Sequence, residues 1–173
     1  MVEAYLGLGS NLGDREKNIA RALELLGERG RVAAVSPLYE TDPVGLTGPL
    51  FLNAVCLYQT ELGPYELLSS IKGIEARLGR KPGLIPRPID IDILIYGELA
   101  MKSETLTIPH PRLAERAFVL VPLAELAPEL VVPGRGDKVS WFLERVGRAG
   151  ARPWKVLASK GARGKKGRNQ WVI

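Results

Sequence analysis

Residues 87–96 read Arg-Pro-Ile-Asp-Ile-Asp-Ile-Leu-Ile-Tyr, and residues 89–96 form the clearest strand pattern in the chain. Side chains two positions apart lie on the same face of a strand, so the four isoleucines of this segment are expected on one face. Asp90 and Asp92 then lie on the opposite face, roughly 7 Å apart. Because the isoleucine face suits a core, we expect a central strand of a sheet.

Apolar segments on the N-terminal side of this strand predict three more strands and two helices. Asp14 can cap a helix that continues to Gly27, and Pro64 suits the first turn of a second helix that ends at Gly79. The expected strands are residues 2–8, 32–39 and 51–61. The order βαββαβ is the ferredoxin-like pattern, in which one sheet carries both helices on a single face.

The fold prediction is therefore an α+β protein, a ferredoxin-like βαββαβ sandwich with additional short C-terminal strands and helices. The added helices are expected around Pro122 and over residues 139–146. A chain of 173 residues suits one domain, which we place at residues 1–158, followed by a basic, mobile tail at 159–173.

The chain has the features of an intracellular protein. Cys56 is the only cysteine, no charged-then-apolar leader opens the sequence, and no apolar run approaches the roughly 18 residues of a membrane span. We therefore expect a soluble, cytoplasmic protein without a membrane partner, and we take a monomer as the starting assumption.

The net charge of +5 at pH 7 arises at the C-terminal end. Residues 1–144 carry 15 basic and 19 acidic side chains, whereas residues 145–173 carry nine basic and no acidic ones. Such an end is commonly a solvated terminus, but it leaves open an alternative function, a ferredoxin-like RNA-binding module that uses the basic tail. The expected third strand lacks the aromatic signature of these modules and the body is acidic, so we expect no nucleic-acid partner.

Asp90 and Asp92 are the strongest candidates for chemistry. Mg²⁺ prefers carboxylate oxygen and keeps waters and substrate phosphates as its other ligands, so two carboxylates on one strand face could hold a pair of ions. The alternative is an ordinary half-exposed strand. Aspartate is a poor strand residue, however, and two on one face repel each other unless a cation lies between them.

Arginines precede these carboxylates in a loop rich in proline and glycine. Arg80 and Arg87 bracket the loop, and phosphoryl transfer needs positive charge around the moving group, which arginine supplies as a planar fork. Solvated loop cations are the alternative interpretation. The loop could also act as a lid.

Three other segments carry weaker signals. His110 is the only histidine, and a lone histidine is more often structural. The glycines of residues 7–13 match neither nucleotide-binding loop motif, so we interpret them as a tight turn. Phe51 and Asn53 are two apart on one strand face, where a ring and an amide could bind a flat heterocycle, although core packing explains the phenylalanine equally well.

Taken together, residues 2–133 resemble the 6-hydroxymethyl-7,8-dihydropterin pyrophosphokinases. The resemblance is carried by residues 9–12 (Gly-Ser-Asn-Leu), the segment 41–45 before Phe-Leu-Asn at 51–53, Pro-Arg at 86–87 before Asp-Ile-Asp at 90–92, and Leu-Thr-Ile-Pro-His at 106–110. It implies a βαββαβ enzyme of folate biosynthesis in which the hydroxymethyl oxygen attacks the β-phosphorus of ATP and AMP leaves.

The resemblance also implies a role for each matching position. Asp90 and Asp92 would bind two Mg²⁺ ions, and Arg80 and Arg87 would act on the phosphates. Asn53 would bond the edge of the pterin. The implied pterin pocket consists of Thr41, Pro43, Val44, Phe51, Asn53 and Phe118, and the implied ATP site contains Lys72, Glu75, Ile93, Thr107, His110 and Arg116.

The chain departs from the family pattern in the loop before Arg87. Leu84 and Ile85 stand where the family commonly has a Trp-Gly pair, and the loop is shorter than in the better-known bacterial members. We therefore expect any lid closure to differ, but not the metal site.

Overall fold

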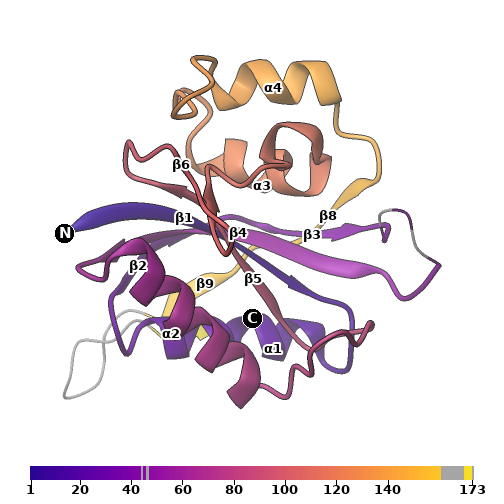
Figure 1. The fold of residues 1–173 in the computed structure, drawn as a ribbon. Coiled ribbons are helices and arrows are strands. Elements are labelled where there is room, and N and C mark those ends of the chain that lie inside the picture. Colours follow the sequence, from indigo (N-terminus) through magenta and orange to yellow (C-terminus); the bar gives the residue numbers. More distant parts are fainter. Residues whose placement is uncertain (44, 46, 161–169, 173) are drawn as a thin grey trace.

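A six-stranded sheet forms the middle layer of the computed structural model, which describes residues 1–43, 45, 47–160 and 170–172 (Figure 1). The strand order is β5-β1-β4-β3-β8, with β2 also pairing with β4. All of these pairings are antiparallel, which confirms the predicted α+β fold. The strands are β1 (Val2–Ser10), β2 (Arg31–Val35), β3 (Leu38–Thr41), β4 (Phe51–Thr60), β5 (Asp90–Tyr96) and β8 (Ala151–Lys155).

Helices α1 (Arg15–Leu26) and α2 (Pro64–Arg77) cover one face of the sheet, as expected (Figure 1). The Asp14 carboxylate accepts a hydrogen bond from the Lys17 backbone N–H at 3.1 Å and caps α1, while Pro64 begins α2. Apolar side chains from both helices meet the sheet in one core, which includes Ile19, Leu23, Leu67, Ile71, Leu6, Leu8 and Ile91.

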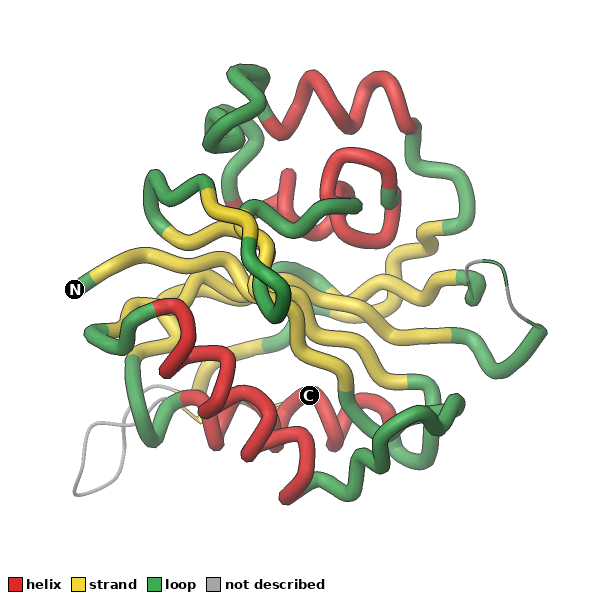
Figure 2. The backbone as a smooth tube through the Cα atoms, viewed as in Figure 1, coloured by secondary structure: helices red, strands yellow, loops and turns green. Residues whose placement is uncertain are grey.

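The C-terminal half covers the opposite face with α3 (Ala117–Leu126) and α4 (Val139–Val146), so helices lie on both sides of the strands (Figure 2). A second core forms there from Leu120, Leu123, Leu143, Val55 and Leu94. Pro122 lies inside α3. Two short strands, β6 (Met101–Lys102) and β7 (Thr107–Ile108), and a 3-10 turn at Leu113–Glu115 lie between β5 and α3.

The predicted strand over 32–39 is two strands, β2 and β3. The break falls at Ser36 and Pro37, because proline has no N–H to continue a ladder. Ser36 bonds to β4 at this point: its backbone N–H donates to the Val55 carbonyl at 2.9 Å, and its hydroxyl accepts from the Val55 N–H at 3.0 Å.

Strand β5 differs from its prediction in two ways. It lies at the end of the described strand order, so it is an edge strand and not a central one. A bulge at Leu94 also shifts its register with β1, and Ile95 therefore enters the second core while Ile91 and Ile93 remain in the first. The isoleucine side chains of β5 are therefore divided between the two cores.

Beyond β8, the chain crosses toward α1. Leu157 is buried in the first core, and β9 (Ala158–Lys160) pairs with β10 (Gln170–Val172), which lies beside α1 (Figure 1). Residues 161–169, most of the predicted tail, lie outside the described residues, so the mobile tail stays a prediction. Among the described residues, no helix is long and apolar enough to cross a membrane.

Candidate functional site

A pocket opens between the C-terminal part of β1, its neighbours β4 and β5, and the beginning of α3. Its two halves differ in chemistry: aromatic and amide groups come from β4 and α3, while the carboxylates and guanidinium groups around β5 come from that strand, from its preceding loop and from Arg116 at the start of α3. The pocket is lined by Gly7, Leu8, Gly9, Thr41, Asp42, Pro43, Phe51, Asn53, Ala54, Val55, Ile85, Arg87, Asp90, Asp92, Leu94, Arg116, Phe118 and Val119.

Two glycines of β1 line the middle of this pocket. Gly9 pairs with Asn53 on one side and Asp90 on the other, and Gly7 pairs with Asp92. A Cβ at Gly9 would lie 2.8 Å from the Asn53 Oδ1 atom, so a side chain there would displace the amide. The interpretation as a tight turn was wrong for Gly7 and Gly9, which lie within β1, whereas Gly13, with a φ of 69°, lies at a bend after the strand. The available signal was glycine inside a strand, which often marks a close approach.

The aromatic and amide half is held by contacts between β3 and β4. The Asn53 amide donates to the Thr41 hydroxyl at 2.6 Å, and both side chains are buried. This bond leaves the Asn53 carbonyl oxygen directed toward the space above Gly9. Phe51 and Phe118 line the pocket from different elements, and Pro43 lines it from the loop after β3. Val44 lies outside the described residues.

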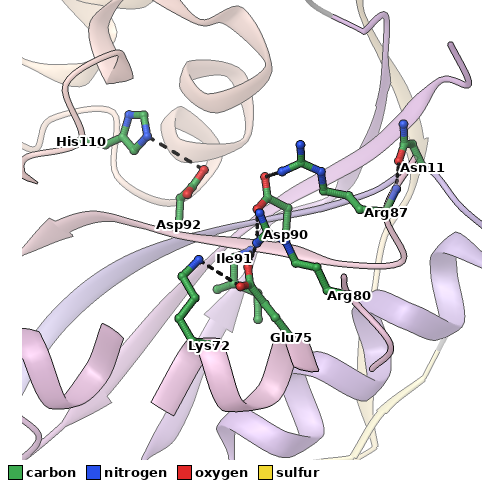
Figure 3. A network of polar contacts seen from close by, with 9 residues as sticks. All are labelled: Asn11, Lys72, Glu75, Arg80, Arg87, Asp90, Ile91, Asp92 and His110. Atoms are coloured by element: carbon green, nitrogen blue, oxygen red, sulfur yellow. Dashed lines mark hydrogen bonds and ion pairs between the residues drawn. The ribbon is translucent and has the colours of Figure 1, made fainter. Parts of the chain in front are cut away.

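Asp90 and Asp92 both line the pocket, as the strand alternation predicts. Asp90 is paired with Arg80 at 2.6 Å and Arg87 at 3.2 Å (Figure 3). Burial, followed by repulsion from Asp90, raises the pKa of Asp92 to about 6. The site therefore holds one carboxylate that arginines neutralise and a second that lacks a close cationic partner among the described residues.

His110 lies beside the second carboxylate. Its backbone N–H donates to the Leu94 carbonyl at 2.8 Å, on the outer edge of β5. The Nδ1 atom accepts from the Arg112 N–H at 3.2 Å, which leaves Nε2 facing the Asp92 carboxylate at 4.0 Å (Figure 3). Burial and the nearby Arg116 guanidinium lower the pKa of His110.

Asn11 joins the loop after β1 to the entrance of β5. Its side-chain oxygen accepts from the Arg87 N–H at 2.8 Å, and its own N–H donates to the Arg87 carbonyl at 3.2 Å. Sequence reasoning missed this role of Asn11. Within the described part of the chain, Nε of Arg87 and Nε of Arg116 are buried without a hydrogen-bond partner, and both residues line the pocket.

Of the other residues predicted for the ATP site, only some lie close to Asp90 and Asp92. Lys72 and Glu75 form an ion pair at 3.0 Å on α2, below Asp90 (Figure 3). Ile93 is buried in the core on the opposite face from Asp92, and Thr107 lies in β7. Neither Ile93 nor Thr107 lines the pocket. Their assignment to the ATP site stays a prediction.

Asp90 and Asp92 could bind a Mg²⁺ ion whose other ligands come from substrate phosphates and water. Among the described residues, no cluster of three or more His, Cys, Asp or Glu side chains could enclose a metal. Mg²⁺ is commonly bound by one or two carboxylates plus phosphate oxygens and waters, and Asp90 and Asp92 beside three arginines fit that pattern.

Sequence comparison decides the family. A family model described as 7,8-dihydro-6-hydroxymethylpterin-pyrophosphokinase matches residues 5–128. The chain belongs to this family. A 2-amino-4-hydroxy-6-hydroxymethyldihydropteridine pyrophosphokinase of Methylorubrum extorquens is 49% identical over 139 residues, which cover 78% of this chain and 88% of the relative. The predicted resemblance is confirmed.

Other members of the pyrophosphokinase family are longer. The mitochondrial folate synthesis bifunctional protein of Arabidopsis thaliana is 50% identical over 129 residues, covering 72% of this chain, which spans only 23% of that relative. A crystal structure of Plasmodium falciparum HPPK-DHPS with pterin and p-hydroxybenzoate shares the fold, with a TM-score of 0.73 at 17% identity over 99% of this chain and 47% of that one.

Proposed function

We propose that the chain transfers the pyrophosphoryl group of ATP to the hydroxymethyl group of 6-hydroxymethyl-7,8-dihydropterin and releases AMP, a reaction of folate biosynthesis. One observation carries the proposal: the amide and aromatic half around Asn53 and the carboxylate and guanidinium half around Asp90 line the same pocket. The hydroxymethyl group of a pterin and the phosphates of ATP could therefore meet inside it.

In the pterin half, Asn53 orients the heterocycle. Its amide is held by Thr41, which presents the carbonyl oxygen to an N–H donor on the edge of the pterin. Phe51 and Phe118 supply apolar surface for the ring, and the two glycines of β1 keep space open beneath it. Pro43 completes this half, and the family resemblance implies Val44 as a further member.

In the nucleotide half, Asp90 and Asp92 would hold Mg²⁺, with two ions as the expected number, and the metal would supply positive charge to the phosphate oxygens of ATP. Arg80 and Arg87 act on the charge of the transferring group, and Arg116, which lines the pocket, supplies a further positive charge for a phosphate. Lys72, Glu75, Ile93, Thr107 and His110 are the remaining members of the proposed ATP site.

The reaction is tested by measuring AMP formation from ATP with and without 6-hydroxymethyl-7,8-dihydropterin, in Mg²⁺ and in EDTA. We expect AMP only when both the pterin and Mg²⁺ are present. AMP formation that does not depend on the pterin, or that persists in EDTA, would rule out the proposal. We also propose that the enzyme is monomeric and cytoplasmic. Gel filtration tests whether it is a monomer.

The RNA-binding alternative is less compatible with the structure. A ferredoxin-like module that stacks bases needs an open sheet face, whereas here α1 and α2 cover one face and α3 and α4 cover the other (Figure 1).

A further inference from the structure

The Glu75 carboxylate lies beneath the site and is almost fully buried, with 3% of its side chain exposed. Within the described residues it accepts three hydrogen bonds: from the Ile91 backbone N–H at 2.8 Å, from Lys72 at 3.0 Å and from Arg80 (Figure 3). A buried carboxylate is costly unless such partners surround it. Glu75 therefore has little capacity left to bind a further ligand directly, so its part in the proposed ATP site would be indirect.

The bond to Ile91 ties α2 to the strand segment that carries the two carboxylates. Because β5 is an edge strand, alternate N–H groups point away from β1 and need another partner. Ile91 lies between Asp90 and Asp92, so Glu75 fixes the backbone between the two candidate metal ligands.

Arg80 is shared between two carboxylates. Its Nη1 atom contacts Glu75 and lies 2.6 Å from the Asp90 Oδ1 atom, while Arg87 approaches the Asp90 Oδ2 atom at 3.2 Å. Each oxygen of Asp90 thus contacts one guanidinium group. A divalent cation that takes Asp90 as a ligand competes with these positive charges, whereas the contact of Arg80 with Glu75 can persist.

We propose that Glu75 is a positioning residue for Arg80. In the metal-free protein Arg80 neutralises Asp90, and when a divalent cation binds Asp90, Glu75 retains Arg80 at the edge of the pocket. Binding of the cation to Asp90 therefore frees the N–H donors of Arg80 that had faced Asp90. This assignment rests on the proposed function for its role in catalysis, whereas the competition between Arg80 and the cation can be measured without turnover.

The competition is tested by titrating Mn²⁺ into the protein without nucleotide and following free Mn²⁺ by electron paramagnetic resonance. Arg80→Ala should bind Mn²⁺ more tightly, on the order of tenfold, because the competing charge is lost. Arg112→Ala is the matched control, since it removes an equal charge from an exposed arginine that pairs with Glu115 at 3.7 Å. If the affinity for Mn²⁺ increases no more in Arg80→Ala than in Arg112→Ala, the proposed competition between Arg80 and the cation is overturned.

The positioning role is tested by a cycle of Glu75→Gln, Arg80→Ala and the double variant. Glutamine can still accept from the Ile91 N–H but no longer attracts a guanidinium ion, so Glu75→Gln should lower kcat with a smaller change in KM for ATP. The double variant should be no slower than Arg80→Ala alone.

Additive losses in that cycle would overturn the positioning role. If the wild type forms no AMP, the proposed reaction fails instead, and the Mn²⁺ titration still decides the competition. Circular dichroism and the melting temperature show whether Glu75→Gln stays folded.

Discussion

Gly9 shows how a single residue sets the shape of the pocket. It lies between Asn53 of β4 and Asp90 of β5, the residues that represent the two chemical halves of the site. A Cβ atom at Gly9 would approach the Asn53 Oδ1 atom to 2.8 Å, which is closer than Cβ atoms come to neighbours in proteins. The absence of a side chain is therefore what leaves the Asn53 carbonyl available.

Gly9→Ala should consequently weaken pterin binding by about 1 to 3 kcal/mol, since the amide has to move and its bonds are lost. Asn53→Ala should cause a loss of similar size, and neither variant should alter ATP binding. Separate calorimetric titrations with the two ligands measure this. Gly73→Ala is the control, because Gly73 lies on the exposed side of α2 and a Cβ atom there meets nothing within 4 Å. This variant should keep the pterin affinity of the wild type and stabilise the helix by up to about 1 kcal/mol. Normal pterin affinity in Gly9→Ala would show that the glycine does not shape the pocket.

Cys56 leads to a prediction about alkaline pH. Its side chain is fully buried in the first core, and burial raises the pKa of the thiol to about 12. From about pH 9 to 12 the unfolded chain loses this proton and the folded chain keeps it, so the stability contributed by this group falls as pH rises. The loss reaches at most about 1.4 kcal/mol per pH unit.

Cys56→Ala should therefore flatten the decline of the unfolding free energy above pH 9, although the cavity it leaves lowers stability at every pH. Urea denaturation at intervals between pH 8 and 10.5 compares the two slopes. Parallel curves for wild type and variant would mean that the thiol does not titrate as its burial indicates.

At the level of elements, β5 combines core formation with the chemistry of the site. Its alternation places Ile91 and Ile93 in one core and directs Asp90 and Asp92 to the pocket, while the bulge at Leu94 turns the strand end toward the second core. The aspartates can therefore be replaced without opening either core.

Asp90→Ala and Asp92→Ala should each lower kcat roughly a thousandfold and leave the fold intact, since losing a metal ligand removes several kcal/mol of transition-state stabilisation. Rates of AMP formation and circular dichroism spectra check both parts. Glu104→Ala removes the same charge from an exposed loop and should keep wild-type activity. If either aspartate variant kept more than a tenth of the wild-type rate, the metal assignment would be wrong.

The sequence predicts elements better than it predicts their pairing. Helix α1 follows from the Asp14 cap, and the directions of Asp90 and Asp92 follow from strand alternation, because these features depend on local geometry. The bulge at Leu94 depends on the register with β1, and the bond from the Ile91 N–H to Glu75 depends on how α2 meets an edge strand. Neither has a local signal.

On the scale of the whole molecule, the pocket-lining residues and the basic segment of the chain are separate in sequence. Every pocket-lining residue in the described part of the chain precedes Leu120, and Leu157 is the last described side chain of the first core. Residues 159–173 carry five basic and no acidic side chains, whereas the whole chain carries 24 basic and 19 acidic ones. Without that segment the basic and acidic side chains are equal in number.

Deleting residues 159–173 should therefore leave kcat unchanged and lower stability only slightly. The segment's positive charge can still accelerate encounter with anionic ATP at low ionic strength, an effect that fades once the Debye length falls below about 10 Å, near 0.1 M salt. Measuring kcat/KM for ATP in the full-length and truncated proteins across ionic strength separates the effect of the segment on encounter with ATP from any effect on the site itself. We expect the ratio of the two values to approach one as salt rises. Loss of activity at every salt concentration would place the segment in the fold or in the site, and would overturn the division of the chain into a domain at 1–158 and a dispensable basic tail.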